Sequence, residues 1–237
     1  MAELLIELLS EEIPARMQAR AAADFRKLVE DRLKEAHLAY ERAHAYVTPR
    51  RLALVVDGLA ERQPDRSEER KGPKVGSPEK ATEGFLRAAG LTSLNQCEQR
   101  AVGKADFWFA VSKIEGQATA AVLPGMITEA IRALPWPKSM RWADGAFRYV
   151  RPLQRINVVF GGEPLAGSLD LGGGLGERTF GDETEGHRFM ARGPIRIKNF
   201  AQYKADLFAH NVILDPAERK AKIAADLEAA AKAEGLT

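Results

Sequence analysis

The chain of 237 residues is long enough for one large domain or two small ones with a sizeable core. Its 35 basic and 33 acidic residues give a formal charge of +2, so no overall field draws it onto nucleic acid, and any polyanion site has to be local. A single cysteine, Cys97, excludes an internal disulfide and a cysteine-rich zinc site, and no apolar run reaches membrane-spanning length. We therefore expect a cytoplasmic protein that makes no membrane contact.

The first sixty residues predict one helix and three strands. Residues 4–9 form a short apolar run that predicts a mostly buried strand. After Pro14, apolar residues recur every three or four positions and predict a helix with one core-facing stripe, ending near Ala36. Residues 40–48 and 51–59 predict two further strands, and the second is apolar enough to be buried on both faces.

The middle of the chain is more polar. Residues 61–80 are charged and rich in proline and glycine, and predict a mobile surface loop. A short helix is predicted over 82–89, closed by the glycine that follows it. Cys97 is expected in a polar loop, and residues 106–114 alternate well enough to predict a strand. Residues 119–134 predict a helix that begins either at 119 or at Pro124.

The next part of the chain predicts strands at 147–150 and 156–160, and a further strand candidate at 165–171. The Gly-Gly pair after Phe160 predicts a hairpin turn. A second glycine run begins at 172. Its spacing fails the pattern of a dinucleotide-binding loop, so it predicts a loop that extends to Gly186.

The last fifty residues predict a brief strand at 195–197 and a helix over about 200–210. A final helix over 217–233 is predicted by its composition, with Asp215 as its N-cap and a proline in its first turn. Because this helix ends close to the last residue, we expect that the chain is a fragment and that the helix begins a further helical region.

These elements predict an α+β fold with a mixed, mainly antiparallel sheet packed with helices, because strands come in pairs without regular βαβ alternation. We expect an α+β domain over residues 1–200, in which 61–130 is a possible subdomain. Residues 201–237 are expected to form a helical segment leading to regions that this chain does not contain.

Residues 134–142, here called the proline corner, combine two of the three tryptophans with two prolines, a lysine and an arginine. The prolines force an extended corner, where indole faces could stack on bases beside phosphate-binding cations. The alternative is a structural corner whose tryptophans fill a core, and on these nine residues alone it is favoured because buried aromatics are commoner. Residues 137–155 carry a net charge of +4, from five cations, Lys138, Arg141, Arg148, Arg151 and Arg155, against Asp144.

The sequence contains no recognisable catalytic set. The four histidines lack any metal-ligand spacing, and no carboxylate pair is singled out for acid–base work. One polar cluster stands out at residues 186–189, Gly-His-Arg-Phe, which could meet a phosphate or a base. The structural alternative comes first: His187 holds loop backbone, and Arg188 pairs with one of three nearby acids, Asp182, Glu183 or Glu185.

Several short segments follow one another along the chain: residues 4–16 (LLIELLSEEIPAR), 48–53 (TPRRLA), 71–73 (KGP), 84–85 (GF), the proline corner, 151–152 (RP) and 186–189 (GHRF). In this order they resemble the motifs of the beta subunit of bacterial glycyl-tRNA synthetase, the heterotetrameric α2β2 type. The chain departs from the family at Arg155-Ile156, where a tryptophan is usual, and in a shorter stretch between Lys74 and Ala81.

The resemblance implies the N-terminal region of a longer beta chain in an aminoacyl-tRNA synthetase, a glycine–tRNA ligase. It implies that tRNA(Gly) and the alpha subunit are partners. It also implies that ATP and Mg²⁺ are used by the alpha subunit, so this region would need no cofactor and would not aminoacylate alone. The alternative function is a scaffold that docks the alpha subunit without touching RNA.

The residues and the resemblance together predict an RNA-binding site with no catalytic residue and no metal ligand. Its expected members are Arg50, Arg51, Trp136, Lys138, Arg141, Trp142, His187 and Arg188.

Overall fold

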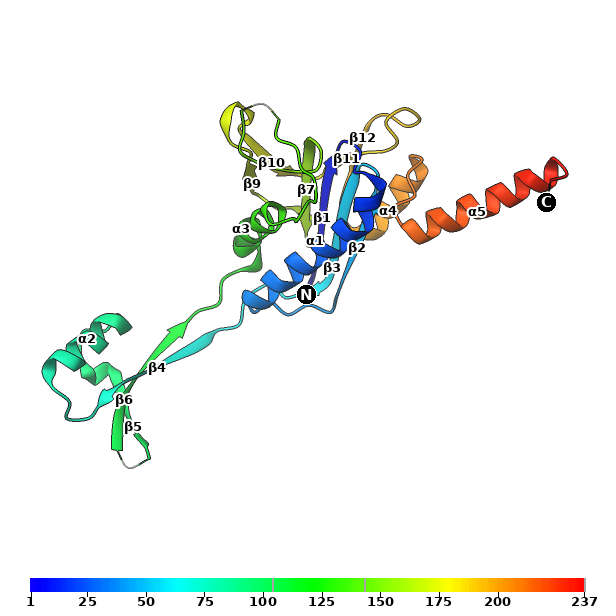
Figure 1. Cartoon of the computed structure of the whole chain (residues 1–237). Coiled ribbons are helices and arrows are strands. Elements are labelled where there is room, and N and C mark those ends of the chain that lie inside the picture. Colours follow the sequence, from blue (N-terminus) through cyan, green and yellow to red (C-terminus); the bar gives the residue numbers. More distant parts are fainter. Residues whose placement is uncertain (104, 143, 237) are drawn as a thin grey trace. The chain divides into compact units, whose positions relative to one another are not determined.

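The computed structural model describes residues 1–103, 105–142 and 144–236, which form two compact units (Figure 1). Unit 1 comprises Met1–Arg62 and Ala118–Thr237, and unit 2 comprises Gln63–Gln117. The domain boundaries predicted from the sequence stay predictions. Among the residues that the structure describes, no helix is long and apolar enough to cross a membrane.

Unit 1 is built on a mixed sheet in the strand order β2-β3-β1-β7-β10-β9, with β8 paired to β7. The strands are β1 (Ala2–Ser10), β2 (Arg42–Thr48), β3 (Arg51–Leu59), β7 (Leu153–Phe160), β8 (Glu163–Pro164), β9 (Ser168–Asp170) and β10 (Glu177–Gly181). Only the pairing of β10 with β7 is parallel among these described strands. A separate antiparallel pair joins β11 (Glu183–Glu185) to β12 (Pro194–Arg196). The predicted α+β class with a mainly antiparallel sheet is therefore confirmed.

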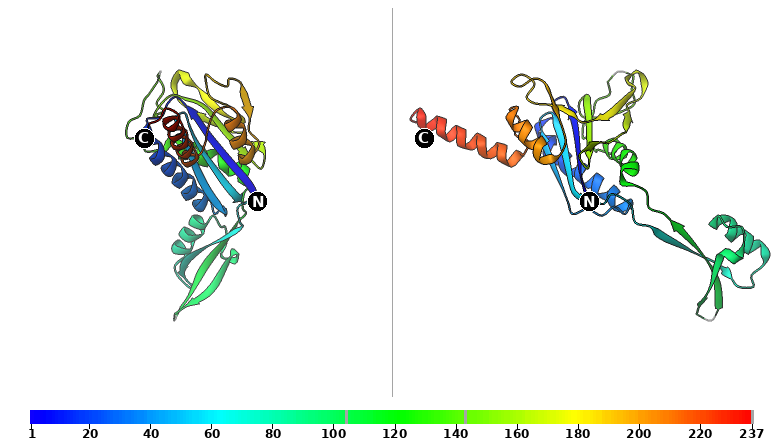
Figure 2. Two further views of the ribbon diagram at one scale, coloured as in Figure 1. Left: turned by 90° about the vertical axis from the view of Figure 1, so that its right-hand side faces the viewer. Right: turned by 180° about the vertical axis from the view of Figure 1, so that it is seen from behind.

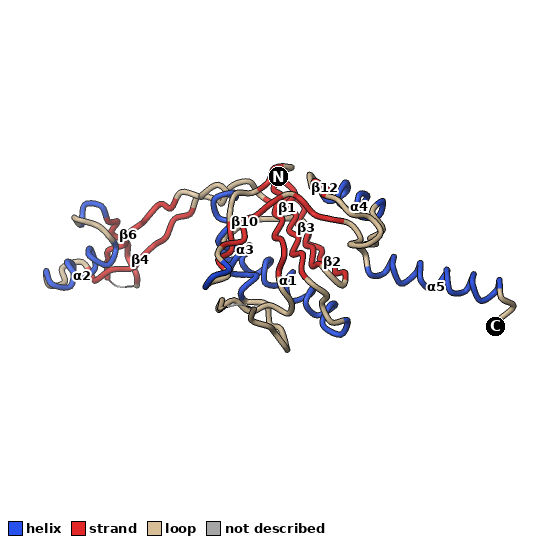
Figure 3. Tube along the Cα trace, turned by 90° about the horizontal axis from the view of Figure 1, so that it is seen from above, coloured by secondary structure: helices blue, strands red, loops and turns tan. Residues whose placement is uncertain are grey.

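Helices cover both faces of this sheet. α1 (Ala15–Glu35) and α3 (Thr119–Arg132) pack on one face, and α4 (Phe200–Ala209) packs on the other, as the views in Figures 2 and 3 show. Alternate residues of each central strand therefore enter different clusters. Leu4 and Leu54 belong to the cluster that contains Phe25 of α1, whereas Leu5 and Val55 belong to the cluster of α4. This two-sided burial explains why β1 and β3 read as continuous apolar runs.

The helices predicted by strong periodicity or capping are confirmed. α1 buries the stripe that steps through Ala21, Phe25, Val29 and Leu33, as its spacing predicts. α5 (Pro216–Ala233) begins where Asp215 accepts a hydrogen bond from the backbone nitrogen of Ala217 at 2.7 Å. No residue of α5 is buried, and beyond Arg219 nearly all of its side chains are exposed to solvent.

Unit 2 is a small α+β unit. Its antiparallel sheet has the order β4-β6-β5, formed by β4 (Arg66–Lys74), β5 (Cys97–Val102) and β6 (Ala105–Ile114). α2 (Glu79–Ala89) ends at Gly90, whose φ of +70° is the left-handed C-cap conformation that glycine adopts without strain. A short 3-10 turn, η1 (Leu94–Gln96), leads into β5.

Three predictions in the polar parts of the chain were wrong. Residues 66–74, expected in a mobile loop, form β4. Its side chains are mostly exposed, so the strand carries no apolar alternation. Cys97, expected in a polar loop, begins β5, which was missed because most of its side chains are exposed as well. Residues 172–186, also expected as a loop, contain η2 (Gly173–Leu175), β10 and β11.

Two further corrections concern prolines and short aromatic runs. α3 begins at Thr119 with Pro124 inside the helix, so the alternative start at Pro124 was wrong. The strand predicted at 147–150 is reduced to one isolated antiparallel bridge between Tyr149 and Met140. Phe147, Tyr149 and Val150 are buried in the main core instead, which accounts for their apolar character.

Candidate functional site

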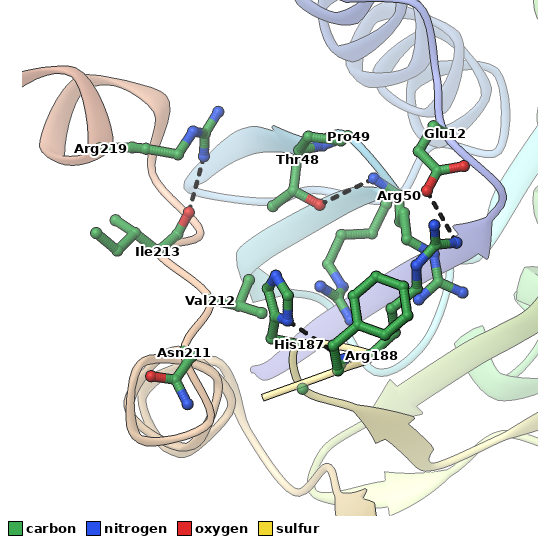
Figure 4. A pocket seen from close by; sticks show the side chains of 13 residues that line it. Glu12, Thr48, Pro49, Arg50, His187, Arg188, Asn211, Val212, Ile213 and Arg219 are labelled. Atoms are coloured by element: carbon green, nitrogen blue, oxygen red, sulfur yellow. Dashed lines mark hydrogen bonds and ion pairs between the residues drawn. The ribbon is translucent and has the colours of Figure 1, made fainter. Parts of the chain in front are cut away.

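Three separated segments of unit 1 meet around a pocket of about 330 Å³ (Figure 4). They are the turn between β2 and β3, the segment that follows β11, and the segment from the end of α4 into the start of α5; Glu12 of the β1–α1 connection completes the lining. Two of the segments singled out in the sequence, Thr-Pro-Arg-Arg at 48–51 and Gly-His-Arg-Phe at 186–189, therefore lie on one site. The third wall comes from Asn211, Val212, Ile213 and Arg219.

The β2–β3 turn is held tightly in place. The Thr48 side-chain oxygen accepts a hydrogen bond from the backbone nitrogen of Arg50 at 3.3 Å. The backbone nitrogens of Ser10 and Ile13 donate to the carbonyls of Arg50 and Pro49, at 2.8 and 2.6 Å. The turn is thus fixed to the connection between β1 and α1, which carries two of the acids that face the pocket cations.

Arg51 points into the interior. Its guanidinium pairs with Glu7 at 3.1 Å and donates to the Glu185 carbonyl at 2.6 Å, and both charged side chains are almost fully buried. Glu7 also accepts hydrogen bonds from Asn157, at 2.9 Å, and from the hydroxyl of Tyr203. Burial, and then the Glu7 carboxylate, raise the pKa of Tyr203 well above its usual range. The donors of Arg51 are thus engaged inside the fold, and the expected phosphate contact at Arg51 stays a prediction.

Arg50 and Arg188 meet acids as well. The Arg50 guanidinium, 14% exposed, donates to Glu185 at 3.1 Å and to Gln154 at 2.8 Å. Arg188, 40% exposed, pairs with Glu11 at 3.3 Å and with Glu12 at 2.9 Å. Both acids that pair with Arg188 lie in the β1–α1 connection, so the alternative that paired Arg188 with Asp182, Glu183 or Glu185 was wrong. The positive charge of the pocket is largely neutralised in place.

His187 organises the turn that follows β11. Its Nδ1 accepts hydrogen bonds from the backbone nitrogens of Phe189 and Met190 at 3.3 and 3.2 Å, which places the proton of the neutral ring on Nε2. Its own backbone nitrogen donates to the His210 carbonyl at 2.9 Å. Gly186 is required there, because a Cβ would lie 2.4 Å from the Cβ of His210. The structural alternative for His187, holding loop backbone, is the arrangement observed.

Arg219 closes the pocket from α5. Its guanidinium donates to the carbonyl of Ile213 at 2.8 Å and to the carbonyl of Val47 in β2 at 3.2 Å. Burial lowers the pKa of this side chain. These bonds fasten the first turn of α5 to the sheet, so Arg219 serves as an anchor of the helix and was not singled out by any sequence motif.

The tryptophans of the proline corner pack onto the main core. Trp136 lies edge-on to Tyr149 with ring centroids 4.8 Å apart, and Trp142 lies edge-on to Phe147 at 5.9 Å. Both indoles are half-buried, so each fills core space and keeps part of its surface in solvent. One side of each indole therefore packs as the structural alternative for the corner expects, and the other side remains accessible to solvent.

The cations of the corner are on its outer side. The backbone nitrogen of Met140 donates to the carbonyl of Tyr149 at 2.7 Å, which forms one isolated antiparallel bridge. Trp142 packs on the buried Phe147, whereas the side chains of Arg141 and Arg148 are exposed. Lys138, Arg141 and Arg148 are all exposed, and none forms an ion pair with the residues described. Arg148 was missed as a site residue, although the net positive window contained it.

The predicted site residues thus fall into two groups. The pocket gathers Arg50, Arg51, His187 and Arg188. The proline corner gathers Trp136, Lys138, Arg141 and Trp142. Within residues 1–103, 105–142 and 144–236, no group of three or more His, Cys, Asp or Glu side chains is placed to hold a metal ion.

Comparisons with known proteins agree over the whole chain. A family model described as "Glycyl-tRNA synthetase beta subunit" matches residues 4–237. The glycine–tRNA ligase beta subunit of Rhodospirillum centenum is 52% identical over 254 residues, covering 100% of this chain and 36% of the relative. The beta subunit of Ruegeria sp. (strain TM1040) is 50% identical, covering 100% of this chain and 34% of the relative. The chain spans about a third of the length of these relatives and belongs to the glycyl-tRNA synthetase beta subunit family.

Proposed function

We propose that the chain is the N-terminal part of a glycine–tRNA ligase beta subunit that binds tRNA(Gly) and associates with the alpha subunit in an α2β2 enzyme. The family match over residues 4–237 is the observation that carries this proposal. ATP, Mg²⁺ and the adenylate chemistry belong to the alpha subunit in this proposal. The contribution of this chain is to hold and orient the tRNA in the cytoplasm.

The proline corner offers the better phosphate contact. Lys138 and Arg141 of the corner, and Arg148 just beyond it, are exposed and have no acidic partner among the described side chains, so their charge is available to a polyanion. The exposed sides of Trp136 and Trp142 lie on the same segment and can stack on bases. In the pocket, Arg50 and Arg188 would have to exchange their glutamates for phosphate, and His187 would contribute by holding the turn that carries Arg188.

Charge reversal at the corner tests the proposal. Full-length beta subunit carrying Lys138→Glu and Arg141→Glu is assembled with the alpha subunit, and its affinity for tRNA(Gly) is measured at two salt concentrations. We expect binding to weaken about tenfold or more and its salt dependence to become shallower, because two phosphate contacts are lost.

A matched control makes the same charge change elsewhere on unit 1. Lys34 in α1 and Lys220 in α5 are exposed and form no ion pair with described residues, so Lys34→Glu with Lys220→Glu should leave tRNA binding within about twofold. Equal losses in the two variants would contradict a local contact at the corner.

A second function is favoured by a separate observation. Phe189, which lines the pocket, and Met190, the next residue, are each 68% exposed, and large exposed apolar side chains are typical of protein contacts. The region could therefore dock the alpha subunit without touching RNA. Replacing Phe189 and Met190 by serine and measuring co-purification of the alpha subunit beside tRNA affinity separates the two functions, because only docking should fail.

A further inference from the structure

Unit 2 has one face that is covered by its helix. Arg70, which is opposite Ala110 in the register of β4 and β6, donates a hydrogen bond to the Ala88 carbonyl of α2. Phe85 of α2 is buried over Gly72, where a Cβ would lie 2.7 Å from the ring. α2 therefore packs on the face of the sheet that carries Ala110. Because side chains alternate along a strand, the neighbours of Ala110 in β6 point to the other face.

That second face carries two aromatic rings on its central strand. Phe107 and Phe109 are two positions apart in β6, which separates them by about 7 Å along the strand. Each lies beneath a cation: the Lys71 ammonium is 3.9 Å from the centroid of Phe107, and the Arg100 guanidinium carbon is 5.3 Å from that of Phe109. Both rings are half-buried, under flexible side chains that can move.

The same face is positively charged. By the strand register its charged members are four cations and two acids, a difference of +2: Lys71, Lys74, Arg100 and Lys113 against Glu69 and Glu98. Arg100 pairs with both acids, at 2.8 and 2.6 Å. The three lysines are exposed and form no ion pair with the described residues, so no acid neutralises their charge.

We propose that this face of unit 2, defined by Phe107, Phe109 and the lysines around them, binds unpaired nucleotides of tRNA. The inference rests on the proposed tRNA-binding function and assigns it a second, separate site. Rings at alternate positions of a sheet strand stack successive unpaired bases, and a guanidinium plane such as that of Arg100 stacks bases as well. Lys71 would leave its ring for a phosphate when a base arrives.

The chemistry of this face favours single-stranded RNA over two other possible occupants, the alpha subunit and a fully paired RNA stem. Lysine is depleted at protein–protein interfaces, whereas three unpaired lysines surround these rings, which disfavours the alpha subunit as the occupant. A fully paired RNA stem keeps its bases inside the helix, where rings on a flat sheet cannot reach them. Single-stranded RNA presents both base faces and phosphates, and it matches the combination found here.

The first experiment reverses charge on the two faces of unit 2 in the full-length αβ enzyme. Lys71→Glu with Lys113→Glu should weaken tRNA(Gly) binding about tenfold and reduce its salt dependence. The matched control, Lys80→Glu with Arg87→Glu, changes two exposed cations of α2 by the same charge and should alter binding less than about twofold. Equal effects of the two variants would overturn the inference.

The second experiment removes the rings. Phe107→Ala with Phe109→Ala should weaken tRNA binding by about tenfold or more, since stacking contributes to each bound base. Hydrogen exchange of β4, β5 and β6 checks that the sheet is retained, and Phe107→Tyr with Phe109→Tyr, which keep aromatic faces, should restore binding. Loss in both variants, or unchanged tRNA binding with loss of the alpha subunit, would overturn the inference.

Two RNA probes identify the nucleotides and separate this site from the proline corner. A single-stranded oligoribonucleotide should compete with the binding that depends on Phe107 and Phe109, and a blunt RNA duplex should not. Equal competition by the duplex would overturn the inference. If the corner variant bound tRNA normally and the variants of this face lost binding, the site on the sheet would stand. If only the corner variant lost binding, the inference would be overturned and the proposed function would remain.

Discussion

The pocket and the proline corner both contain cations but differ in how much of that positive charge is available to a ligand. In the pocket, Arg50, Arg51 and Arg188 are bound by glutamates from β1, from the β1–α1 connection and from β11. At the corner, Lys138 and Arg141 meet no acid among the residues described. Counting arginines along a sequence therefore locates positive residues, whereas only the fold decides which of them can bind a polyanion.

The largest expected effect lies in the buried ion pair beneath the pocket. Glu7→Ala should lower the free energy of unfolding by about 3–5 kcal/mol, because the Arg51 charge would be left buried without its partner. Urea unfolding of the chain measures the change. Glu7→Gln keeps an acceptor for Asn157 and Tyr203 and should cost less; a loss below about 1 kcal/mol in the alanine variant would show that Arg51 is not held there.

The indole of Trp136 in the proline corner should contribute to stability by packing against the core. Trp136→Ala should lower the free energy of unfolding by about 2–3 kcal/mol, below the cost for a fully buried tryptophan, because one side of the ring is in solvent. Thermal and urea unfolding measure the loss. Lys138→Ala, on the same segment, should be nearly neutral in stability, and a similar cost for both would contradict the division into an inner and an outer side.

Removing the acids that face the pocket should leave its cations without acidic partners, as at the proline corner. Glu11→Gln with Glu12→Gln would release Arg188 from its ion pairs, and tRNA(Gly) should then bind the assembled enzyme about threefold more tightly at low salt. The measurement is the affinity at two salt concentrations. No gain, with the stability unchanged, would show that Arg188 is turned away from any RNA even when it is free.

The smallest expected effect concerns Tyr149. Its hydroxyl is buried without a hydrogen-bond partner among the described residues, and burial raises the pKa of Tyr149 far above its usual value. Tyr149→Phe should therefore be neutral or stabilise by up to about 1 kcal/mol.

Alkaline pH gives the same prediction a second test. An unfolded tyrosine loses its proton near pH 10, while the buried one keeps it, so stability should fall as the pH rises above about 10. Tyr149→Phe should make that fall less steep. An unchanged slope would show that Tyr149 does not contribute to it; Tyr203, whose pKa is raised as well, would then account for the effect.

The sequence predicted those parts of the fold that local patterns determine. α1 and α5 followed from apolar spacing and from the Asp215–Pro216 cap, and β1 and β3 followed from continuous apolar runs. β4 and β10 were missed because strands with exposed, polar side chains in small or marginal sheets lack alternation. Pairing partners, not local composition, define such strands.

The site was predictable in its segments and not in its contacts. The motifs at 48–51 and 186–189 were singled out separately, and the structure brings them to one pocket. The acids that pair with Arg188 lie more than 170 positions away along the chain, so no local pattern could have identified them.

The contrast between the two regions is tested most directly by removing two charges from each in the assembled enzyme. Lys138→Gln with Arg141→Gln is compared with Arg50→Gln with Arg188→Gln, and the affinity for tRNA(Gly) is measured for both at the same salt concentration. We predict a loss of about five- to tenfold for the corner variant and of less than about twofold for the pocket variant. A larger loss from the pocket, or no loss from either, would contradict the account.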